Sequence, residues 1–591
     1  MKYTVLLIIS FLIISCTPNP KVYNDGFITY APVKLTDEEK QIVDESIAES
    51  KKVYDPVEKM ITSTIRAWNA HTDIRSGTVH QIRQSFSYAR ALLNSGDNQN
   101  AQEAFLIIER TLACQDTDPN SRFCGVWTYH AEETTTTLKS AVDTNWADFN
   151  AVTLLEIYMG HKNRIPEELL KKIENAIILA AQFIQKRNVD IVYTNIAIMG
   201  TFVTYVAAHL FDLPDMKVYA KDRLQRVYNF TLENGYTEYN SPAYFPVTLE
   251  ELQRMQRHIV EPDSKMMVDS LYAIGWGIIA RHYHQPTEQW AGPHSRSYSE
   301  TASTAFYGIL NQASNGKIDL GYSSGNADKI LNKHQIPDYL LPYFLSSTYP
   351  RTERDTFERK ELGIYGVTYL TDQYALSSVT KSSMWNQRRP LLVYWGDKEK
   401  PRYMRPKMLY GLEELSSATI FCEQKDNSII AGINFATNGA FRHLYTDLLN
   451  GKLETDDLRL RFQFGNITVE NIKIPKKNDA PVSLVLDGLR FEIQLFYATF
   501  PGYKGYWEKG GDEKNAWLDY VIYSGPKTVI DLNNMNEAAL AFTIELTPAS
   551  EKYSYKKPGF SVKSGLLDAR WKDLQLTLPI KPEKRSKYLY L

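Results

Sequence analysis

The 591-residue sequence has few cysteines, no block of one charge and, after its first residues, no long apolar run. Its four cysteines are not spaced as zinc ligands are, which argues against a zinc-based fold. The 67 lysines and arginines nearly balance the 69 aspartates and glutamates, so the chain lacks the basic field of a nucleic-acid-binding protein. No later stretch of about 18 apolar residues occurs, which excludes a polytopic membrane protein.

Tyrosine is the residue that the sequence has in excess, with 38 Tyr against 24 Phe and 10 Trp. A tyrosine combines a flat apolar face with a hydrogen-bonding tip, which suits both sugar contacts and half-buried packing, and the two interpretations stay open here. With 43% hydrophobic and 23% charged residues, the composition is that of a folded soluble protein. The length predicts two or three domains.

The first residues have the pattern of an export signal. Lys2 gives a short positive start, Val5–Ile14 is apolar but short for a bilayer, and the letters LIISC that end at Cys16 resemble a bacterial lipobox. We therefore expect a lipoprotein signal peptide over 1–16, lipidation at Cys16, and a tether over 17–35. The expected location is the outer membrane, contacted through the anchor only. A plain secretory signal is the alternative, and the membrane face stays open.

The remaining cysteines and the paired histidines bear on disulfides and metals. Cys114 and Cys124 bracket a polar loop, and an exported protein permits a disulfide between them. Cys422 lies in an apolar, strand-like run and is expected to be a buried thiol. His282 and His284 would not converge on one metal if they lie on a helix. No cofactor is expected, and a structural divalent metal is an unsupported alternative.

The hydrophobic period changes once along the chain. Helical periods occupy Thr36–Ala70, Gln81–Asn94, Ala101–Leu112, Asp148–Met159, Pro166–Ile177, Asn195–Phe211, Lys217–Glu233, Leu249–Met255, Lys265–Tyr283 and Glu300–Ser314. Strand-like runs occupy Ile364–Thr371, Leu391–Trp395, Ser428–Phe435, Leu458–Phe464, Ser483–Leu486, Phe491–Tyr497, Leu518–Tyr523 and Ala539–Leu546. We predict a domain of helical hairpins (a bundle, a solenoid or a toroid) over 36–350, followed by an antiparallel β-sandwich over 351–591. No fixed repeat period is visible, which counts against a solenoid.

Three loops of the helical part carry the residues suited to chemistry, because function concentrates in loops that rigid elements hold. They are Glu238–Tyr244 (EYNSPAY), Trp290–Tyr298 (WAGPHSRSY) and Asp143–Asn150 (DTNWADFN). Helix capping is the alternative role for Asp143 and Asn145. Three polar side chains as close as His294, Arg296 and Tyr298 rarely serve packing alone.

Helical hairpins followed by an antiparallel β domain, with an Asn/Tyr loop and a His/Arg/Tyr loop, resemble the polysaccharide lyases of the α/α-toroid plus β-sandwich type. The likeness spans nearly the whole mature chain in layout. It implies an α+β multidomain fold with an (α/α) toroid, a Bacteroidetes-type glycan degradation system and an acidic glycan as partner. The closest type is the lyase that removes L-rhamnose from D-glucuronate in arabinogalactan. Endo or exo action and the oligomeric state stay open.

The resemblance implies roles by residue type and loop position. Elimination from a 4-linked uronate requires neutralising the carboxylate, removing the C5 proton and protonating O4. Tyr298 or Tyr244 is the predicted base and acid, His294 a base or charge-stabilising group, and Asn240 and Arg296 the carboxylate clamp. The further substrate-binding candidates are Asn195, Tyr239, Trp146, His130, Trp385 and Arg388. Capping by Asn195, packing by His130 and an interdomain contact by Trp385 and Arg388 are the alternatives.

Two other functions fit the same sequence. A glycoside hydrolase on a toroid would need two converging carboxylates, for which Asp143, Asp148 and Glu238 are available. The prominent loops are richer in Tyr, His, Asn and Arg than in acids, which favours the lyase. A non-catalytic glycan-binding lipoprotein is the third function, and the large β region argues against it.

Overall fold

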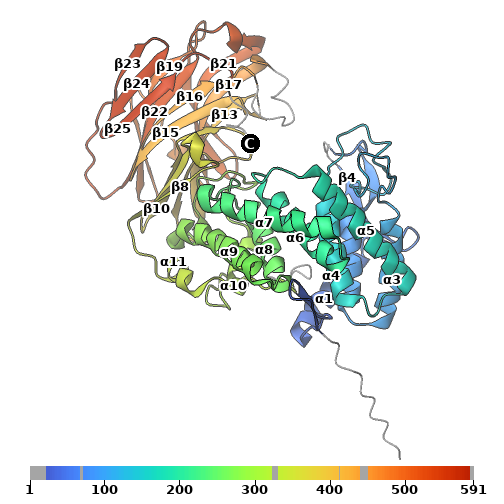
Figure 1. Cartoon of the computed structure of the whole chain (residues 1–591). Coiled ribbons are helices and arrows are strands. Elements are labelled where there is room, and N and C mark those ends of the chain that lie inside the picture. The colour runs from blue at the N-terminus through green and yellow to red at the C-terminus, as the bar shows by residue number, and fades with distance from the viewer. Residues whose placement is uncertain (1–21, 67–70, 323–329, 412, 439–449, 586–591) are drawn as a thin grey trace, which may run out of the picture.

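The computed structural model describes residues 22–66, 71–322, 330–411, 413–438 and 450–585. A helical domain comes first in the chain and a β domain follows, and the two lie against each other (Figure 1). Cys16 and the predicted signal peptide lie outside the described residues. Among the described residues, no helix combines the length and apolar character needed to cross a bilayer.

Helical hairpins build the first domain as a curved double layer. The helices are α1 (Asp37–Lys51), α2 (Ile82–Asn94), α3 (Asn98–Leu112), α4 (Trp146–His161), α5 (Glu167–Arg187), α6 (Thr194–Leu210), α7 (Pro214–Asn234), α8 (Phe245–His258), α9 (Pro262–His282), α10 (Thr304–Ala313) and α11 (Leu341–Leu345). The inner layer is α2, α4, α6 and α8 in contact with one another in that order, and α3, α5, α7 and α9 form the outer layer. The four inner helices therefore run in the same direction, as in an open (α/α) toroid.

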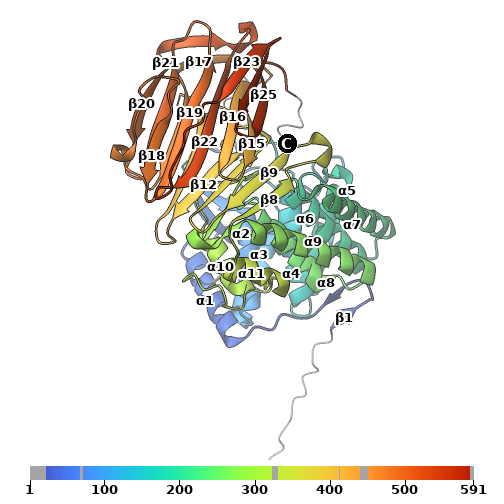
Figure 2. The same ribbon diagram turned by 90° about the vertical axis from the view of Figure 1, so that its left-hand side faces the viewer.

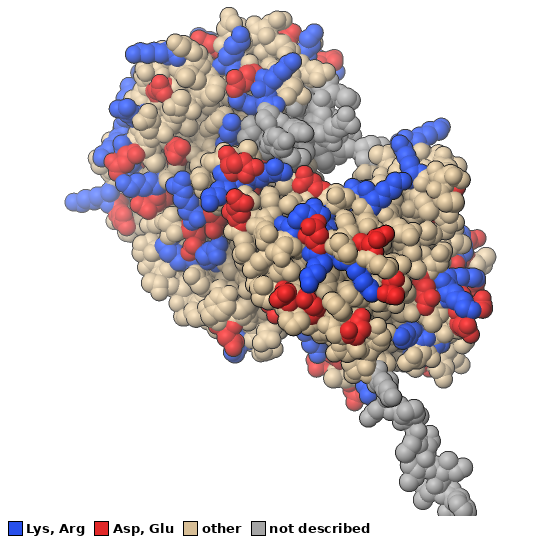
Figure 3. Space-filling model, viewed as in Figure 1, with Lys and Arg blue, Asp and Glu red and all other residues tan. Residues whose placement is uncertain are grey.

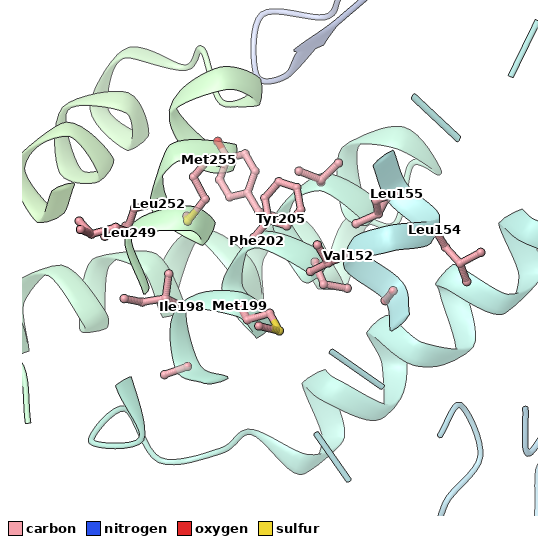
Figure 4. Close-up of a cluster of buried hydrophobic side chains, with 14 of the residues drawn as sticks. Val152, Leu154, Leu155, Ile198, Met199, Phe202, Tyr205, Leu249, Leu252 and Met255 are labelled. Carbon is pink, nitrogen blue, oxygen red and sulfur yellow. The ribbon is translucent and has the colours of Figure 1, made fainter. Parts of the chain in front are cut away.

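The inner helices are buried because their sequences are apolar on nearly every side. Almost every residue of α4 and α6 is buried, whereas α5 and α7 bury only one face. Figure 4 shows the resulting core, to which α4, α6 and α8 contribute Val152, Leu154, Leu155, Ile198, Met199, Phe202, Tyr205, Leu249, Leu252 and Met255. Because large apolar side chains of three adjacent helices pack against one another, the ends of those helices are fixed relative to one another.

A buried ion cluster joins three of the inner helices. Glu156 of α4 accepts a hydrogen bond from Arg254 of α8 (Nε–Oε1 2.8 Å) and pairs with Arg90 of α2. Asn332 donates a further hydrogen bond to the same carboxylate at 3.3 Å. A buried carboxylate with two guanidinium partners is costly to break, so the cluster holds the inner layer in one arrangement.

One part of the helical prediction is wrong. The predicted run Thr36–Ala70 is helical only as far as Lys51 (α1), and a small antiparallel sheet follows, made of β3 (Tyr54–Asp55), β4 (Met60–Ile65) and β5 (Gly77–Gln81). The sequence of β4, MITSTI, is rich in β-branched residues, which favour strands over helices.

The second domain is antiparallel throughout its paired strands. Its strands are β8 (Arg351–Thr356), β9 (Tyr365–Leu370), β10 (Tyr374–Val379), β11 (Lys381–Ser383), β12 (Leu391–Gly396), β13 (Pro401–Tyr410), β14 (Glu413–Glu414), β15 (Ala418–Lys425), β16 (Ser428–Phe435), β17 (Lys452–Gly465), β18 (Val482–Leu486), β19 (Leu489–Thr499), β20 (Tyr506–Gly511), β21 (Asn515–Asp531), β22 (Ala539–Pro548), β23 (Gly559–Lys563), β24 (Leu566–Trp571) and β25 (Leu574–Pro579). A nine-stranded sheet in the order β20-β21-β17-β13-β12-β10-β9-β8, with β14 beside β13, faces a six-stranded sheet in the order β11-β15-β16-β22-β19-β18. The three strands β23–β25 cover the outer side of the second sheet (Figure 2). The predicted fold class, helical hairpins followed by an antiparallel sandwich, is confirmed.

The first described residues attach to the helical domain at one particular end. The Val260 amide donates to the Phe27 carbonyl at 2.8 Å, and the Val33 amide donates to the Gly160 carbonyl at 3.1 Å. Val260 follows α8, and Gly160 lies in the last turn of α4. Residues 27–33 therefore lie at the C-terminal ends of the inner helices.

The predicted disulfide is not formed, because Cys114 and Cys124 are separate thiols. Cys114 follows α3, and its Sγ turns back to that helix, accepting from the Arg110 guanidinium at 3.3 Å and contacting the Arg110 carbonyl at 3.7 Å. Burial raises the pKa of the Cys114 thiol. The loop between the cysteines is instead held by hydrogen bonds to Asp116, including one from Ser121.

Candidate active site

The four inner helices begin at the same end of the helical domain, and their cap residues are unusual. The caps are Gln81 for α2, Asn145 for α4, Tyr193 for α6 and Tyr244 for α8, and none of them makes a side-chain capping hydrogen bond. Their side chains are therefore available for other contacts. Helix N-termini also carry partial positive charge, which favours an anionic ligand at this end of the domain.

Tyr244 is the centre of a connected polar cluster. The Arg296 Nη2 donates to the Tyr244 hydroxyl at 2.9 Å, and the hydroxyls of Tyr244 and Tyr298 are 2.6 Å apart. The Arg296 guanidinium also lies 4.6 Å from the centre of the Tyr244 ring and 4.7 Å from that of Trp385. Tyr298 is 66% exposed, so the cluster opens to solvent at one end.

The environment of Tyr244 acts on its acidity in two directions. Burial raises the pKa of Tyr244 above its ordinary value, and the neighbouring Tyr298 hydroxyl raises it further. The Arg296 charge opposes both effects. A guanidinium in hydrogen-bond contact is the group best placed to favour a phenolate here.

The β domain holds the loop that carries Arg296 and Tyr298. The backbones of His294 and Arg389 pair as an antiparallel bridge, and the Ser297 amide donates to the Gln387 carbonyl at 2.7 Å. The Arg296 Nε donates to the Gln387 Oε1 at 2.9 Å. The Glu300 carboxylate, farther along the loop, accepts from Arg389 at 2.6 Å and lies 3.0 Å from the Arg405 Nε. The tyrosine cluster is therefore assembled from both domains.

A cavity of about 330 Å³ lies beside the cluster, between the two domains. Tyr193, Glu238 and Arg296 line it from the helical domain, and Arg359 and Arg388 line it from the β domain. The volume is within the range of roughly 300–1,000 Å³ found for small-molecule sites. Figure 3 shows acidic and basic side chains interspersed over the visible face. The cavity lining is mixed as well, since Asp190, Glu238 and Glu358 accompany the three arginines.

Glu238 is the buried carboxylate of this cavity, 7% exposed. Asn195 donates to it from the backbone (3.0 Å to Oε2) and from the side-chain amide (2.9 Å to Oε2). Burial raises the pKa of Glu238 to about 7, and the Asn195 hydrogen bonds and the Arg296 charge act in the opposite direction. Both protonation states are therefore accessible near neutral pH.

Tyr193 connects the cavity to the start of α4. The Asn145 Nδ2 donates to the Tyr193 hydroxyl at 3.3 Å, and the Asn145 Oδ1 accepts from Arg187 at 3.1 Å. Arg187 is held in turn by Asp148, with Nη2 and Oδ2 2.7 Å apart. Burial raises the pKa of Tyr193 to about 12, so this phenol stays protonated at neutral pH.

Residues 40–339, which carry most of these side chains, match a family described as a domain of unknown function, DUF8769. The chain belongs to this family. No curated protein matches it.

Several solved structures are similar to this DUF8769 member. They include a heparinase III (10% identity, TM-score 0.37, 92% of this chain and 90% of that chain) and a chondroitin AC lyase mutant of Streptomyces coelicolor (10%, 0.40, 90% and 83%). The heparan sulfate lyase HepC from Pedobacter heparinus is a third (9%, 0.32, 94% and 90%).

The structure brings together only part of the predicted site of this DUF8769 member. Tyr244, Arg296 and Tyr298 form the cluster, and Trp385 packs against its guanidinium. Arg388 lines the cavity, with its Nη2 2.7 Å from the Glu358 carboxylate.

Three other predicted residues contact protein groups. The His294 Nε2 lies 3.0 Å from the Trp290 carbonyl, and burial lowers the pKa of this histidine to about 3. The Asn240 amide donates to the carbonyls of Ala291 and Pro293 at 2.7 and 3.1 Å. The Tyr239 hydroxyl lies 2.8 Å from the His282 Nε2. These side chains hold the loop through protein contacts. The roles predicted for His294 in proton transfer and for Asn240 in the carboxylate clamp stay predictions, which these contacts do not support.

The remaining predictions fall at other places. Asn195 neither caps a helix nor lines the cavity, since its amide holds Glu238. Trp146 and His130 line a second pocket at the starts of α2 and α4. His282 and His284 use both ring nitrogens in hydrogen bonds to protein, which leaves neither free to bind a metal.

Sequence reasoning assigned no role in the site to Tyr193 and Asn145, and it considered Glu238 only for a hydrolase. A signal for the first two was present. Tyrosine is a poor helix cap, so Tyr193 directly before the apolar run of α6 pointed to a role other than capping. Asn145 looked like a cap, but its side chain bonds Tyr193 and Arg187 instead.

Proposed function

We propose that this protein is a polysaccharide lyase that cleaves the bond to O4 of a glucuronate residue by β-elimination. The observation that carries the proposal is the hydrogen-bonded row of Arg296, Tyr244 and Tyr298 at the edge of a cavity between two domains. The row provides a group that takes a proton and returns it, next to a fixed positive charge.

The chemistry follows from the geometry of glucuronate. Its C5 hydrogen and O4 lie on the same face of the ring, so one group can serve both proton transfers. Loss of one proton from the Tyr244–Tyr298 pair leaves a phenolate, which the other hydroxyl and Arg296 stabilise by hydrogen bonds. The phenolate takes the C5 proton, the C4–O4 bond breaks as the C4=C5 double bond forms, and the phenol gives the proton to the departing O4. The phenolate is thereby restored.

The substrate carboxylate must be neutralised for the C5 proton to become acidic. Arg296 is the cation that we assign to this task, because Arg388 pairs with Glu358 and Arg359 with Asp190 at the cavity wall. Glu238 in its protonated form has an O–H to donate to the same carboxylate. These side chains complete the proposed reaction with no cofactor.

The substrate that we propose is an acidic glycan with 4-linked glucuronate, and the finer proposal is release of rhamnose from glucuronate in arabinogalactan. The proposed setting is the outer membrane, with a lipid on Cys16 as the membrane contact. Arg296, which lines the cavity and contacts Tyr244, supports an acidic substrate on a nearly neutral chain.

A glycoside hydrolase is the second candidate, and one observation favours it. Glu238 is a buried carboxylate in the cavity with a pKa raised to about 7, which is the property of a general acid in such enzymes. Substitution of this residue separates the two functions. Glu238→Gln imitates the protonated acid, so a lyase retains substrate binding and activity, whereas a hydrolase loses its proton donor.

The test is incubation of the protein with heparosan, chondroitin and arabinogalactan, all of which contain glucuronate. A lyase yields an unsaturated uronate, detected by its ultraviolet absorbance. We expect rising absorbance with the wild type and a loss of at least about 100-fold in kcat for the double variant Tyr244→Phe, Tyr298→Phe. The exposed Tyr339→Phe is the matched control and should not differ from wild type. New reducing ends without absorbance would establish the hydrolase, and full activity of the double variant would refute the tyrosine mechanism.

A further inference from the structure

A second pocket, of about 530 Å³, lies at the same end of the helical domain, over the starts of α2 and α4. Its walls come from β4, from residues Gln81–Gln84 and from the segment that precedes α4. It shares no lining residue with the cavity beside Glu238. The proposed reaction does not use it.

Aromatic rings and one guanidinium form part of this pocket. The rings of Tyr129 and Trp146 pack edge to face, with centroids 4.3 Å apart. The Arg83 guanidinium lies 4.1 Å from the centroid of Phe149 and 6.0 Å from that of Trp146. Arg83 and Gln84 are exposed. The aromatic contacts hold an otherwise flexible cation in one place at the mouth of the pocket.

A buried polar group of the pocket is unsatisfied. His130 lines the pocket and is 6% exposed, and its Nδ1 has no hydrogen-bond partner among the described residues. Burial lowers the pKa of His130, so the ring is neutral at pH 7. A neutral imidazole suits a hydroxyl, which can donate to it or accept from it.

The cavity beside Glu238 and the second pocket lie next to each other. Tyr193 lines the first, and Trp146 lines the second. Asn145 directly precedes Trp146 and donates to the Tyr193 hydroxyl, so the walls of the cavity and of the second pocket are joined by a hydrogen bond. A chain of sugars placed at Glu238 and Tyr244 would extend over Asn145 to reach the aromatic pocket.

We propose that the second pocket is a saccharide subsite that binds a further sugar of the same glycan, with an acidic group of that glycan at Arg83. The subsite rests on the proposed function in one respect, namely that one glycan binds in both the cavity beside Glu238 and the second pocket. Aromatic faces for the sugar ring, a neutral histidine for a hydroxyl and a fixed cation for a carboxylate or sulfate are all present. The enzyme is therefore expected to prefer oligosaccharides over its minimal substrate.

The experiment measures binding in the double variant Tyr244→Phe, Tyr298→Phe, in which slowed turnover keeps the ligand intact during the titration. Heparosan and chondroitin oligosaccharides of two, four and six residues, and arabinogalactan fragments ending in rhamnosyl-glucuronate, are titrated calorimetrically. Adding Arg83→Ala should weaken binding of the longer ligands about tenfold and leave that of the disaccharides unchanged. Arg226→Ala is the matched control, since Arg226 is partly exposed on α7, away from both pockets, and pairs with Asp222.

The outcomes separate the subsite from the lyase. Equal loss of affinity at every length, no loss at any length, or no binding of any of these glycans overturns the subsite. A length-dependent loss in a protein whose wild type produces neither absorbance nor reducing ends retains the subsite and overturns the catalytic function. Because Arg83 is exposed, the variant should melt at the wild-type temperature; Gln84→Ala, also exposed and at the pocket wall, should show a weaker effect of the same length dependence.

Discussion

At Tyr244, a cation and a phenol act on the same hydroxyl in opposite directions. Arg296 favours the phenolate, and burial and Tyr298 favour the phenol. The pKa of Tyr244 can therefore be changed by a substitution at Arg296, with both tyrosines left in place. Arg296 also donates a hydrogen bond to Gln387.

Replacement of Arg296 should shift the pH dependence of catalysis. Arg296→Gln removes the charge that lowers the pKa of Tyr244, so the rising limb of kcat/KM against pH should move to higher pH, with a loss of about 100-fold at pH 7. Arg296→Lys keeps the charge and should shift the profile less. The measurement is the pH profile of product absorbance. An unchanged limb in Arg296→Gln would show that this arginine does not set the acidity of the base.

Glu238 makes the stability of the protein depend on pH. Its pKa is raised to about 7 in the folded state from an ordinary value near 4.5, so the folded protein holds the proton more tightly than the unfolded chain does. Stability is therefore retained below the ordinary value and falls as the pH rises toward 7. Glu238→Gln should melt at a higher temperature than wild type at pH 8, by the equivalent of up to about 3 kcal/mol, and near the wild-type temperature at pH 4.

The control for this stability effect is an acid whose pKa is lowered in the folded protein. The Glu261 carboxylate accepts from the Ser264 amide and pairs with Lys221, so Glu261→Gln should lower the melting temperature at pH 8. Equal melting temperatures of Glu238→Gln and wild type at both pH values would contradict the predicted titration of Glu238.

At the scale of elements, the loop over residues 291–303 is attached to the β domain, although it belongs to the helical part of the sequence. Hydrogen bonds from Thr368 to Gly292 and from Ser297 to Gln387 fix it to strands and turns of the sandwich. The carboxylate of Glu300 completes the attachment between Arg389 and Arg405.

Removing that carboxylate should loosen the site from a distance. Glu300→Ala leaves buried Arg389 without its carboxylate partner and Arg405 with Glu414 alone, at a cost of about 3 kcal/mol, and releases the loop that carries Arg296 and Tyr298. We expect a lower melting temperature together with a lower kcat. Glu288→Ala is the control, since Glu288 lies 3.7 Å from Lys398 at the surface and should change stability by less than about 1 kcal/mol. Equal effects of the two variants would refute the attachment.

The elements themselves were largely predictable, because period and burial agree. Helices such as α6 and α7 differ from their predicted ranges by only a few residues at each end. The sheet of β3 to β5 was missed because polar, β-branched β4 follows a true helix without a strong break.

For the whole molecule, the site was predictable only where it lies in one loop or two. Arg296 and Tyr298 are near in sequence, and Tyr244 has the residue type that the chemistry needs. Asn240 and His294 have equally suitable side chains, but both contact backbone carbonyls of the loop over residues 290–298. Sequence does not show toward which partner a polar side chain turns when the partner is far along the chain, as Gln387 is from Arg296.

The proposed lipid anchor should affect location without affecting chemistry. Cys16→Ser should move the protein from the membrane fraction to the soluble fraction, with kcat on a soluble glycan unchanged, since residues 27–33 contact the opposite end of the helices from Tyr244. Cys114→Ser is the control and should stay with the membrane. Retention of Cys16→Ser in the membrane fraction would disprove lipidation at this residue.

The attachment of residues 27–33 at the C-terminal ends of α4 and α8 also determines which way an anchored molecule would face relative to the membrane. The 14 residues of α8 separate that end from Tyr244 by about 21 Å. An anchored molecule would therefore hold the opening of the candidate active site on the side that faces away from the bilayer. Branched polymers too bulky to approach the lipid surface would still have access to the catalytic groups.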